Sequence, residues 1–341
     1  MTIREALAHV VKGESLSQQQ MTEVMMEIMT GAATPAQIGG FLVALRMKGE
    51  SIDEITGAAI VMRQLATRVE VTADYLVDTC GTGGDGANLF NVSTAAAFVV
   101  AAAGGHVAKH GNRSVSSSTG SADVLEAAGI NLQMAVDKVA RAIEQIGVGF
   151  MFAPAHHGAM KHAIGPRKEL GMRTLFNMLG PMTNPAGAKR QIIGVFDRKL
   201  CWPVAEVLQR LGSEHVMVVH AADGLDELSV AADSHIVELR DGKITEYTLD
   251  PATLGIAKQP LDTLKVENPG QSLSLIRAAF AGEAGQAVQL ASSIIALNAG
   301  AAIYVAGLTH SLANGLAMAE DAIASGAAAE KLKELVEFSN Y

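Results

Sequence analysis

The first 70 residues carry a helical pattern with clear start signals. Ser17, Thr34 and Ser51 are each followed three residues later by Gln or Glu, which is the spacing of a capping box. Helices this short cannot bury an apolar face alone. We therefore predict a small helical domain over residues 1–72 that packs on itself, on the rest of the chain or on a second copy. Behind Ser51, one apolar helix face is predicted from Ile52, Ile55, Met62 and Leu65.

From about residue 73, strand patterns alternate with helix patterns. This alternation is typical of an α/β domain with a mostly parallel central sheet, which we assign to residues 73–341. A hairpin is predicted within 236–249, where Asp241-Gly242 suits the two-residue turn, and the chain from Ser272 on is Ala-rich and helical. Strands are predicted at 75–78, 106–109, 148–153, 191–196 and 215–220, and helices at 93–103, 121–128, 136–146 and 199–211.

Composition narrows the class of protein. The chain has 341 residues, 49% of them hydrophobic, and a formal net charge of −9, which argues against a nucleic-acid-binding surface. Cys80 and Cys201 are the only cysteines, so neither a disulfide framework nor a thiolate metal site is expected. The N-terminus lacks a signal-peptide core. Residues 284–319 carry no formal charge, but polar residues recur in them, which predicts buried or interface helices and no membrane span. We expect a cytoplasmic protein.

The segment 81–86, directly after the first predicted strand, contains four glycines in six positions. Glycine allows positive φ and a close approach of main-chain N–H groups to a ligand. Further on, an apolar helix is predicted to stop at Gly104-Gly105 and to be capped by Asn91, Ser93 and Thr94. The next strand leads to a cluster of Lys109, His110, Asn112 and Arg113. A glycine-rich turn, a helix N-terminus and basic side chains together indicate a site for a highly phosphorylated anion.

A dinucleotide is the first alternative for that anion, because Gly81, Gly83 and Gly86 satisfy the spacing G-x-G-x-x-G. That fingerprint also needs an acidic residue about 20 positions further on, which would bind the ribose. The first acidic residue after Asp85 is Asp123, so the context is wrong. Asp85 would also repel a pyrophosphate unless a cation lay between them. The nucleotide P-loop pattern is absent.

Four loops that carry charge or glycine each follow a predicted strand: the glycine-rich segment, the Lys109 cluster, 154–157 and 223–227. Ligands of open α/β sheets bind outside the carboxyl ends of the strands, so we expect one composite site. Asp226 and Glu227 are adjacent acids in the last of these loops. Mg²⁺ is typically held by one or two carboxylates together with substrate phosphates, and we assign the pair to such a metal.

Six blocks of the sequence resemble the anthranilate phosphoribosyltransferases, which catalyse the second step of tryptophan synthesis. They occur in the family's order and spacing over most of the chain. The blocks are GTGGDG (81–86), NVSTA (91–95), VAKHGNRSVSS (107–117), GFMFAPAHHGAMKH (149–162), RTLFNMLGPMTNP (173–185) and DGLDELS (223–229).

The resemblance implies a Mg²⁺-dependent homodimer that transfers a 5-phosphoribosyl group from phosphoribosyl pyrophosphate to the amine of anthranilate. The helical domain would form the dimer contact, with 167–190 packing back on it. The resemblance implies that phosphoribosyl pyrophosphate contacts Gly81, Gly84, Asp85, Asn91, Val92, Ser93, Thr94, Lys109, Ser117 and Ser121. It implies that anthranilate contacts Gly81, Asn112 and Arg167. The implied metal ligands are Ser93, Asp226 and Glu227. Which residues hold the 5-phosphate and which the pyrophosphate stays open.

Lys109 and His110 are the candidates for direct roles in catalysis. His110 is a weak candidate for a proton acceptor, because an aromatic amine is already neutral at physiological pH. His156, His157 and His162 match no zinc spacing, and His157 is expected to line the acceptor region. Leu89 stands where the family commonly has a small hydroxyl residue, so one polar contact to the donor is expected to be missing.

Two other functions remain open at this stage: a pyrimidine nucleoside phosphorylase of the same fold, and a non-enzymatic nucleic-acid-binding relative. Asp226, Glu227 and Arg167 count against the first, and the net charge of −9 counts against the second. The family also allows an association with anthranilate synthase. Neither a nucleic acid nor a membrane is expected as a partner.

Overall fold

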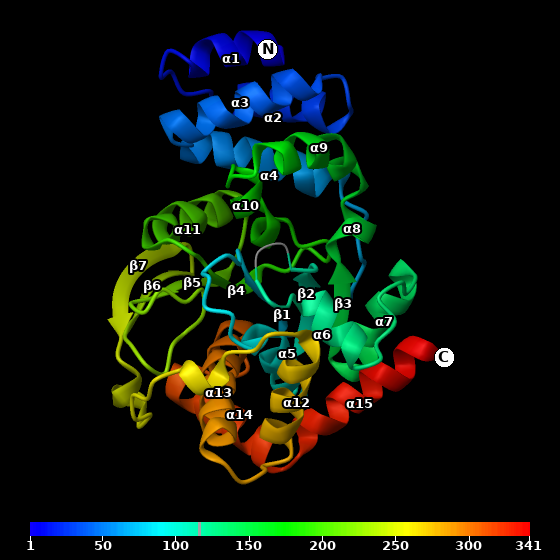
Figure 1. The fold of residues 1–341 in the computed structure, drawn as a ribbon, viewed down its shortest axis with the longest axis vertical. Helices are drawn as coiled ribbons and strands as arrows, with labels where there is room; N and C mark the ends of the chain where they lie inside the picture. The colour runs from blue at the N-terminus through cyan, green and yellow to red at the C-terminus, as the bar shows by residue number, and fades with distance from the viewer. Residues whose placement is uncertain (115–116) are drawn as a thin grey trace.

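The N-terminal helices form a bundle at one end of the molecule (Figure 1). We describe the chain from a computed structural model, for residues 1–114 and 117–341. The three predicted capping boxes are confirmed, and Thr2 with Glu5 forms a fourth. Each box ties a side chain to a main-chain N–H three residues away, so it depends on local sequence alone. The helices are α1 (Ile3–Val10), α2 (Gln18–Met29), α3 (Pro35–Lys48) and α4 (Ile52–Leu65).

The centre of the molecule is a seven-stranded sheet with the order β3-β2-β1-β4-β5-β6-β7. The first five strands of this order pair in parallel, and β6 and β7 form an antiparallel hairpin, so the predicted mostly parallel sheet and hairpin are confirmed. The strands are β1 (Leu76–Gly81), β2 (His106–Gly111), β3 (Val148–Phe152), β4 (Arg190–Gly194), β5 (His215–Ala221), β6 (Ser234–Arg240) and β7 (Lys243–Leu249). The order reverses between β1 and β4, which is where ligands of such sheets bind.

The alternation of side chains along a strand divides the core between the two faces of the sheet. On β5, Val216 and Val218 join the apolar cluster that contains α11 and the helical bundle, whereas Met217 and Val219 join the cluster on the opposite face. That opposite face is covered by the C-terminal helices and α5 (Figure 1). The helices of the α/β part are α5 (Val92–Ala102), α6 (Ser121–Ala127), α7 (Val136–Ile146), α11 (Cys201–Arg210), α12 (Pro269–Phe280), α13 (Gln286–Ala306), α14 (Leu312–Ala324) and α15 (Ala327–Asn340).

Helix α13 is the only helix among the described residues that is long and apolar enough to cross a membrane, and 72% of its apolar window is buried. It packs against α14, α5 and the sheet, which makes it a core helix.

The chain between β3 and β4 returns to the helical bundle. Helix α9 (Lys161–Leu170) packs on α2 and α3, and α10 (Phe176–Leu179) packs on α4. Short turns complete this connection at α8 (Ala153–His156), η1 (Gly158–Met160) and η2 (Gly180–Thr183). Residues on this connection therefore face the carboxyl end of the sheet from the side of the bundle. Outside it lie the short helices η3 (Arg198–Leu200), η4 (Pro251–Leu254) and η5 (Asp262–Leu264).

Candidate functional site

The glycine-rich loop begins where β1 ends, at the position where the strand order reverses. Gly83, Gly84 and Gly86 have φ of +66°, +82° and +75°, which glycine adopts without strain. The loop is fixed to β4 because the Thr82 N–H donates to the Gly194 carbonyl at 2.9 Å. The Gly83 N–H donates to Oδ2 of Asp226 at 2.7 Å. The fold thus brings the predicted glycine and acidic loops together.

Asp226 and Glu227 lie at the carboxyl end of the sheet, in the loop after β5. Burial and the neighbouring Asp85 raise the pKa of Asp226, while burial and Asp226 itself raise the pKa of Glu227. Three acids in a poorly solvated place repel one another, and a cation among them would relieve this repulsion. No group of three or more His, Cys, Asp or Glu residues in the described part of the chain could hold a metal by itself.

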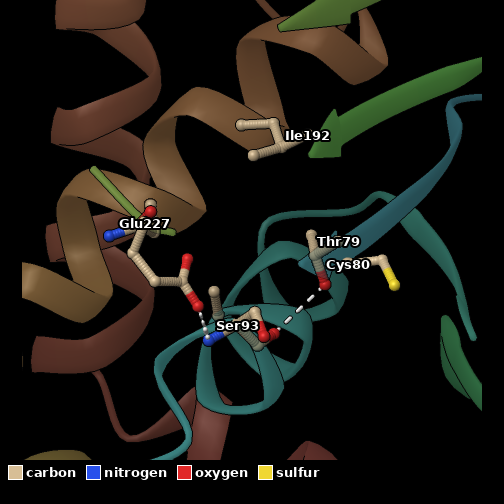
Figure 2. Close-up of a pocket in the computed structure, with 7 residues that line it drawn as sticks. Thr79, Cys80, Ser93, Ile192 and Glu227 are labelled. Atoms are coloured by element: carbon tan, nitrogen blue, oxygen red, sulfur yellow. Dashed lines mark hydrogen bonds between the residues drawn. The ribbon is translucent and has the colours of Figure 1, made fainter. Parts of the chain in front are cut away.

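The N-terminus of α5 faces this acid pair. The Ser93 N–H donates to Oε1 of Glu227 at 3.2 Å (Figure 2). Asn91 is the N-cap, without a side-chain cap bond, and Ser93 and Thr94 lie in the first turn of the helix. The prediction that Ser93 and Thr94 cap the helix was therefore wrong. A distant carboxylate takes that place, and the Asn91 side chain instead bonds to Ser272 and Thr119.

Lys109 lies beneath the helix N-terminus, only 3% exposed. Its Nζ donates to the Thr79 carbonyl and to Oγ of Ser93, the latter at 3.4 Å. No carboxylate lies within ion-pair distance of Lys109 among the described residues. Thr79, Ser93 and Glu227 line a small cavity of about 10 Å³ between β1, β4 and α5. Figure 2 shows these three residues.

A buried carboxylate links the strands and the connection that surround the site. Asp78 on β1 accepts hydrogen bonds from the His110 N–H at 3.2 Å and from Nδ2 of Asn184 at 2.8 Å. The same Nδ2 donates to the Ala108 carbonyl, so Asn184 ties the connection from the bundle to both β1 and β2. Burial raises the pKa of Asp78 to about 6, against the opposite effect of Lys109.

The rings of His110 and His157 are in contact, with centroids 5.0 Å apart and planes tilted by 55°, and both side chains are buried. Burial and the neighbouring histidines lower the pKa of His110 to about 3 and that of His157 to about 4, so both imidazoles are neutral. Nε2 of His110 and both ring nitrogens of His157 have no hydrogen-bond partner in the described structure. His156 instead bonds through Nδ1 to the Thr67 carbonyl at 2.9 Å.

The residues of the predicted basic cluster after β2 have different partners in the structure. Arg113 pairs with Asp123 and Glu126 on α6, at 3.1 and 2.7 Å. Asp123 and Glu126 therefore compensate the charge of Arg113 in this structure, and its place in the anion site stays a prediction. The Asn112 carbonyl accepts from Oγ of Ser121 at 3.3 Å. Ser117 donates to the Thr119 carbonyl, and Val115 and Ser116 of this block lie outside the described residues.

Arg167 approaches from the bundle, on the last turn of α9. Its guanidinium lies 5.2 Å from the centre of the Phe176 ring, and burial lowers its pKa. No hydrogen bond in the described parts of the chain joins Arg167 to Gly81 or Asn112, and their common role toward anthranilate stays a prediction. Leu89 pairs with Lys265 in an isolated bridge and packs on the core, which leaves it no polar role.

Sequence reasoning missed two residues of the site. Gly194 ends β4, and a Cβ built there would lie 1.5 Å from the Asp226 carbonyl oxygen, so only glycine admits the acidic loop. A glycine at the end of a predicted strand was the available signal. The other is Arg173, whose Nη2 donates to the Gly84 carbonyl. Arg173 begins the block 173–185, but no role was assigned to it from the sequence, because its partner lies 89 residues away.

Comparison with known proteins agrees with this arrangement. Residues 4–66 match the helical bundle domain of the glycosyl transferase family, and residues 73–329 match its a/b domain. The anthranilate phosphoribosyltransferase of Teredinibacter turnerae is 72% identical over 340 residues and covers the whole of both chains. That of Saccharophagus degradans is 73% identical and covers 99% of each chain.

Solved structures share the whole fold. The anthranilate phosphoribosyltransferase of Thermus thermophilus superposes with a TM-score of 0.92 at 43% identity, covering 98% of this chain and 99% of that one. The Saccharomyces cerevisiae enzyme, solved in complex with PRPP and Mg, has a TM-score of 0.89, covers 99% of this chain and 98% of its own, and at 24% identity supports the fold alone.

Proposed function

This chain belongs to the anthranilate phosphoribosyltransferase family, and we propose that its composite site transfers a 5-phosphoribosyl group from phosphoribosyl pyrophosphate to anthranilate. The products are N-(5-phosphoribosyl)anthranilate and pyrophosphate, and the reaction is the second step of tryptophan synthesis from chorismate. One observation carries the assignment of the donor site. The glycine loop, the N-terminus of α5 and the Asp226–Glu227 pair meet where the strand order reverses.

In the transfer, the bond between C1 of the ribosyl group and the pyrophosphate oxygen breaks, and its electron pair leaves with pyrophosphate. The amine lone pair then forms the C1–N bond from the opposite face, and the amine releases one proton. Negative charge grows on the leaving group, so fixed donors there lower the barrier. We assign this task to the loop N–H groups of Gly81, Gly84 and Asp85, the first turn of α5 at Val92, Ser93 and Thr94, and Lys109, with Asn91, Ser117 and Ser121 as further donor contacts.

The donor set fits Mg²⁺. Asp226, Glu227 and Ser93 offer only hard oxygen ligands, and they lie next to the predicted phosphate site. Mg²⁺ usually keeps water and phosphate ligands besides one or two carboxylates, so a group of three protein acids is not required. When bound, the ion would neutralise charge on the departing pyrophosphate.

The acceptor half of the site lies between the two parts of the chain. We assign the anthranilate carboxylate to Arg167, whose planar fork suits it and which has no carboxylate of its own in the described structure. Gly81 and Asn112 complete this pocket in the proposal. The neutral imidazoles of His110 and His157 leave unpaired nitrogens nearby, and His110 is the candidate acceptor for the released proton.

We further infer that the protein is a homodimer that contacts its copy through α1–α4, and that it works in the cytoplasm. Val11 and Met47 are apolar side chains of this domain that are 70% and 83% exposed. Sedimentation at micromolar concentration tests this assembly, and a fully active monomer would contradict it. Association with anthranilate synthase stays a prediction.

The test of the function is to mix the protein with anthranilate, phosphoribosyl pyrophosphate and Mg²⁺ and to follow anthranilate fluorescence. We expect the signal to fall, and to stay constant when the donor or Mg²⁺ is omitted. A parallel reaction with uridine and phosphate tests the phosphorylase alternative. Uracil release there, with constant anthranilate fluorescence, would overturn the proposal.

A further inference from the structure

Arg173 joins the segment between α9 and α10 to the glycine-rich loop. Its Nη2 donates to the Gly84 carbonyl, and its guanidinium lies 4.0 Å from the centre of the Phe196 ring. No carboxylate lies within ion-pair distance of it in the parts of the chain that the structure describes. A cation with no acidic partner, held over an aromatic ring at the edge of an anion site, is an arrangement that needs an explanation in a protein with a net charge of −9.

The other contacts that hold this loop come from the α/β domain. The Thr82 N–H donates to the Gly194 carbonyl at 2.9 Å, and Oγ1 of Thr82 accepts from the Phe196 N–H at 3.1 Å. Gly83 donates to Asp226 at 2.7 Å. Among the described residues, only Arg173 hydrogen-bonds to the loop from the connection that packs on the helical bundle. The loop is therefore shared between the two parts of the chain.

The contact fixes the direction of one peptide group. The carbonyl of Gly84 and the N–H of Asp85 belong to the same planar trans peptide and point in opposite directions. When Arg173 holds the carbonyl, the Asp85 N–H must point away from Arg173, on the other side of the loop. Gly84 has φ of +82°, which glycine adopts without strain, and a Cβ there would lie 2.9 Å from Nη2 of Arg173, so any other residue would strain the turn and shift the contact.

We propose that Arg173 is a positioning residue that orients the glycine loop for the pyrophosphate of the donor. Its cationic hydrogen bond also strengthens the loop N–H groups as donors, because it polarises the peptide that carries one of them. Arg173 lies six residues after Arg167, to which we assign the acceptor carboxylate, on the same connection from the bundle. One segment would thus contact both substrates. This inference rests on the proposed function only for the identity of the donor.

The test compares Arg173→Ala and Arg173→Lys with Arg198→Ala. Arg198 is a matched control because it follows Phe196 by two residues, is exposed, and among the described residues pairs with Glu246 alone, at 3.6 Å. Calorimetric titration with pyrophosphate and Mg²⁺ measures the donor site without turnover. We expect Arg173→Ala to weaken pyrophosphate binding and to raise the donor KM by about 10-fold, the effect of losing one charged hydrogen bond, with anthranilate KM at saturating donor unchanged.

Conservative variants separate a role of Arg173 in orienting the glycine loop from a role in folding. Arg173→Lys keeps the charge but loses the planar guanidinium over Phe196, so it should recover only part of the affinity. Phe196→Leu keeps an apolar side chain and should give a smaller loss in the same parameter. Equal pyrophosphate affinity in Arg173→Ala and Arg198→Ala would overturn the proposal. The two proposals fail separately. If the parent protein does not convert anthranilate but Arg173→Ala still weakens pyrophosphate binding, the proposed function is refuted and the role of Arg173 is supported.

Discussion

Gly194 is the position where one added methyl group should do most damage to the site. It ends β4 directly beside the acidic loop, where a Cβ would lie 1.5 Å from the Asp226 carbonyl oxygen and 2.4 Å from its carbon. Both neighbours are backbone atoms, so no rotamer change can relieve the clash. Gly194→Ala must therefore displace the loop that carries Asp226 and Glu227.

The size of the displacement follows from the geometry. Restoring an ordinary contact of 3.4 Å from 1.5 Å requires the Asp226 oxygen and the strand to separate by 1.9 Å. Mg²⁺ demands ligands at about 2.0–2.1 Å in near-octahedral geometry, so a shift of this size removes a ligand. A misplacement of about 1 Å already costs roughly 100-fold in rate, and we expect at least that loss in kcat/KM. Overpacking should also destabilise the fold by about 1–3 kcal/mol.

The assay is anthranilate fluorescence at several Mg²⁺ concentrations, with thermal unfolding measured on the same samples. Gly39→Ala is the control, because a Cβ at Gly39 meets nothing within 4 Å and lies inside helix α3. It should keep full activity and gain stability, since alanine favours a helix. A Gly194→Ala protein with the parent's rate and Mg²⁺ dependence would refute the assignment of the acidic loop to the metal.

Three further changes test other parts of the site. Arg167→Ala should raise the anthranilate KM by roughly 10- to 100-fold and leave the donor KM nearly unchanged. Arg167→Lys should restore only part of the affinity for anthranilate. The reverse pattern in steady-state kinetics would place Arg167 on the phosphate side. Asp226→Asn should lower the rate by roughly 100-fold or more and raise the Mg²⁺ requirement; an unchanged Mg²⁺ titration would exclude it as a ligand. His157 titrates near pH 6.5 when unfolded but has a folded pKa of about 4, so the unfolded chain binds more protons and the free energy of unfolding falls as pH falls from about 6.5 to 4. Urea unfolding between pH 7 and 5 should show a shallower fall for His157→Gln, and an equal slope would contradict the buried neutral imidazole.

Local sequence determined the elements of this protein. The capping boxes at Ser17, Thr34 and Ser51 use partners three residues away, so their helices could be predicted residue by residue. The Asp241-Gly242 turn has φ of +51° and +72°, the geometry that this pair favours between two strands. The glycine, basic and acidic loops were predictable as one site, because the carboxyl ends of parallel strands share an edge.

Only the tertiary structure decided which partner each side chain within that site has. Ser93 was expected to cap α5, but its own N–H donates to Glu227, which lies 134 residues further along the sequence. Arg113 was expected at the anion site, and in this structure Asp123 and Glu126 compensate its charge. Gly194 and Arg173 acquire their importance from backbone atoms of Asp226 and Gly84. A sequence pattern reports periodicity and local hydrogen bonding, whereas these roles depend on which distant groups the folded sheet places within a few ångströms.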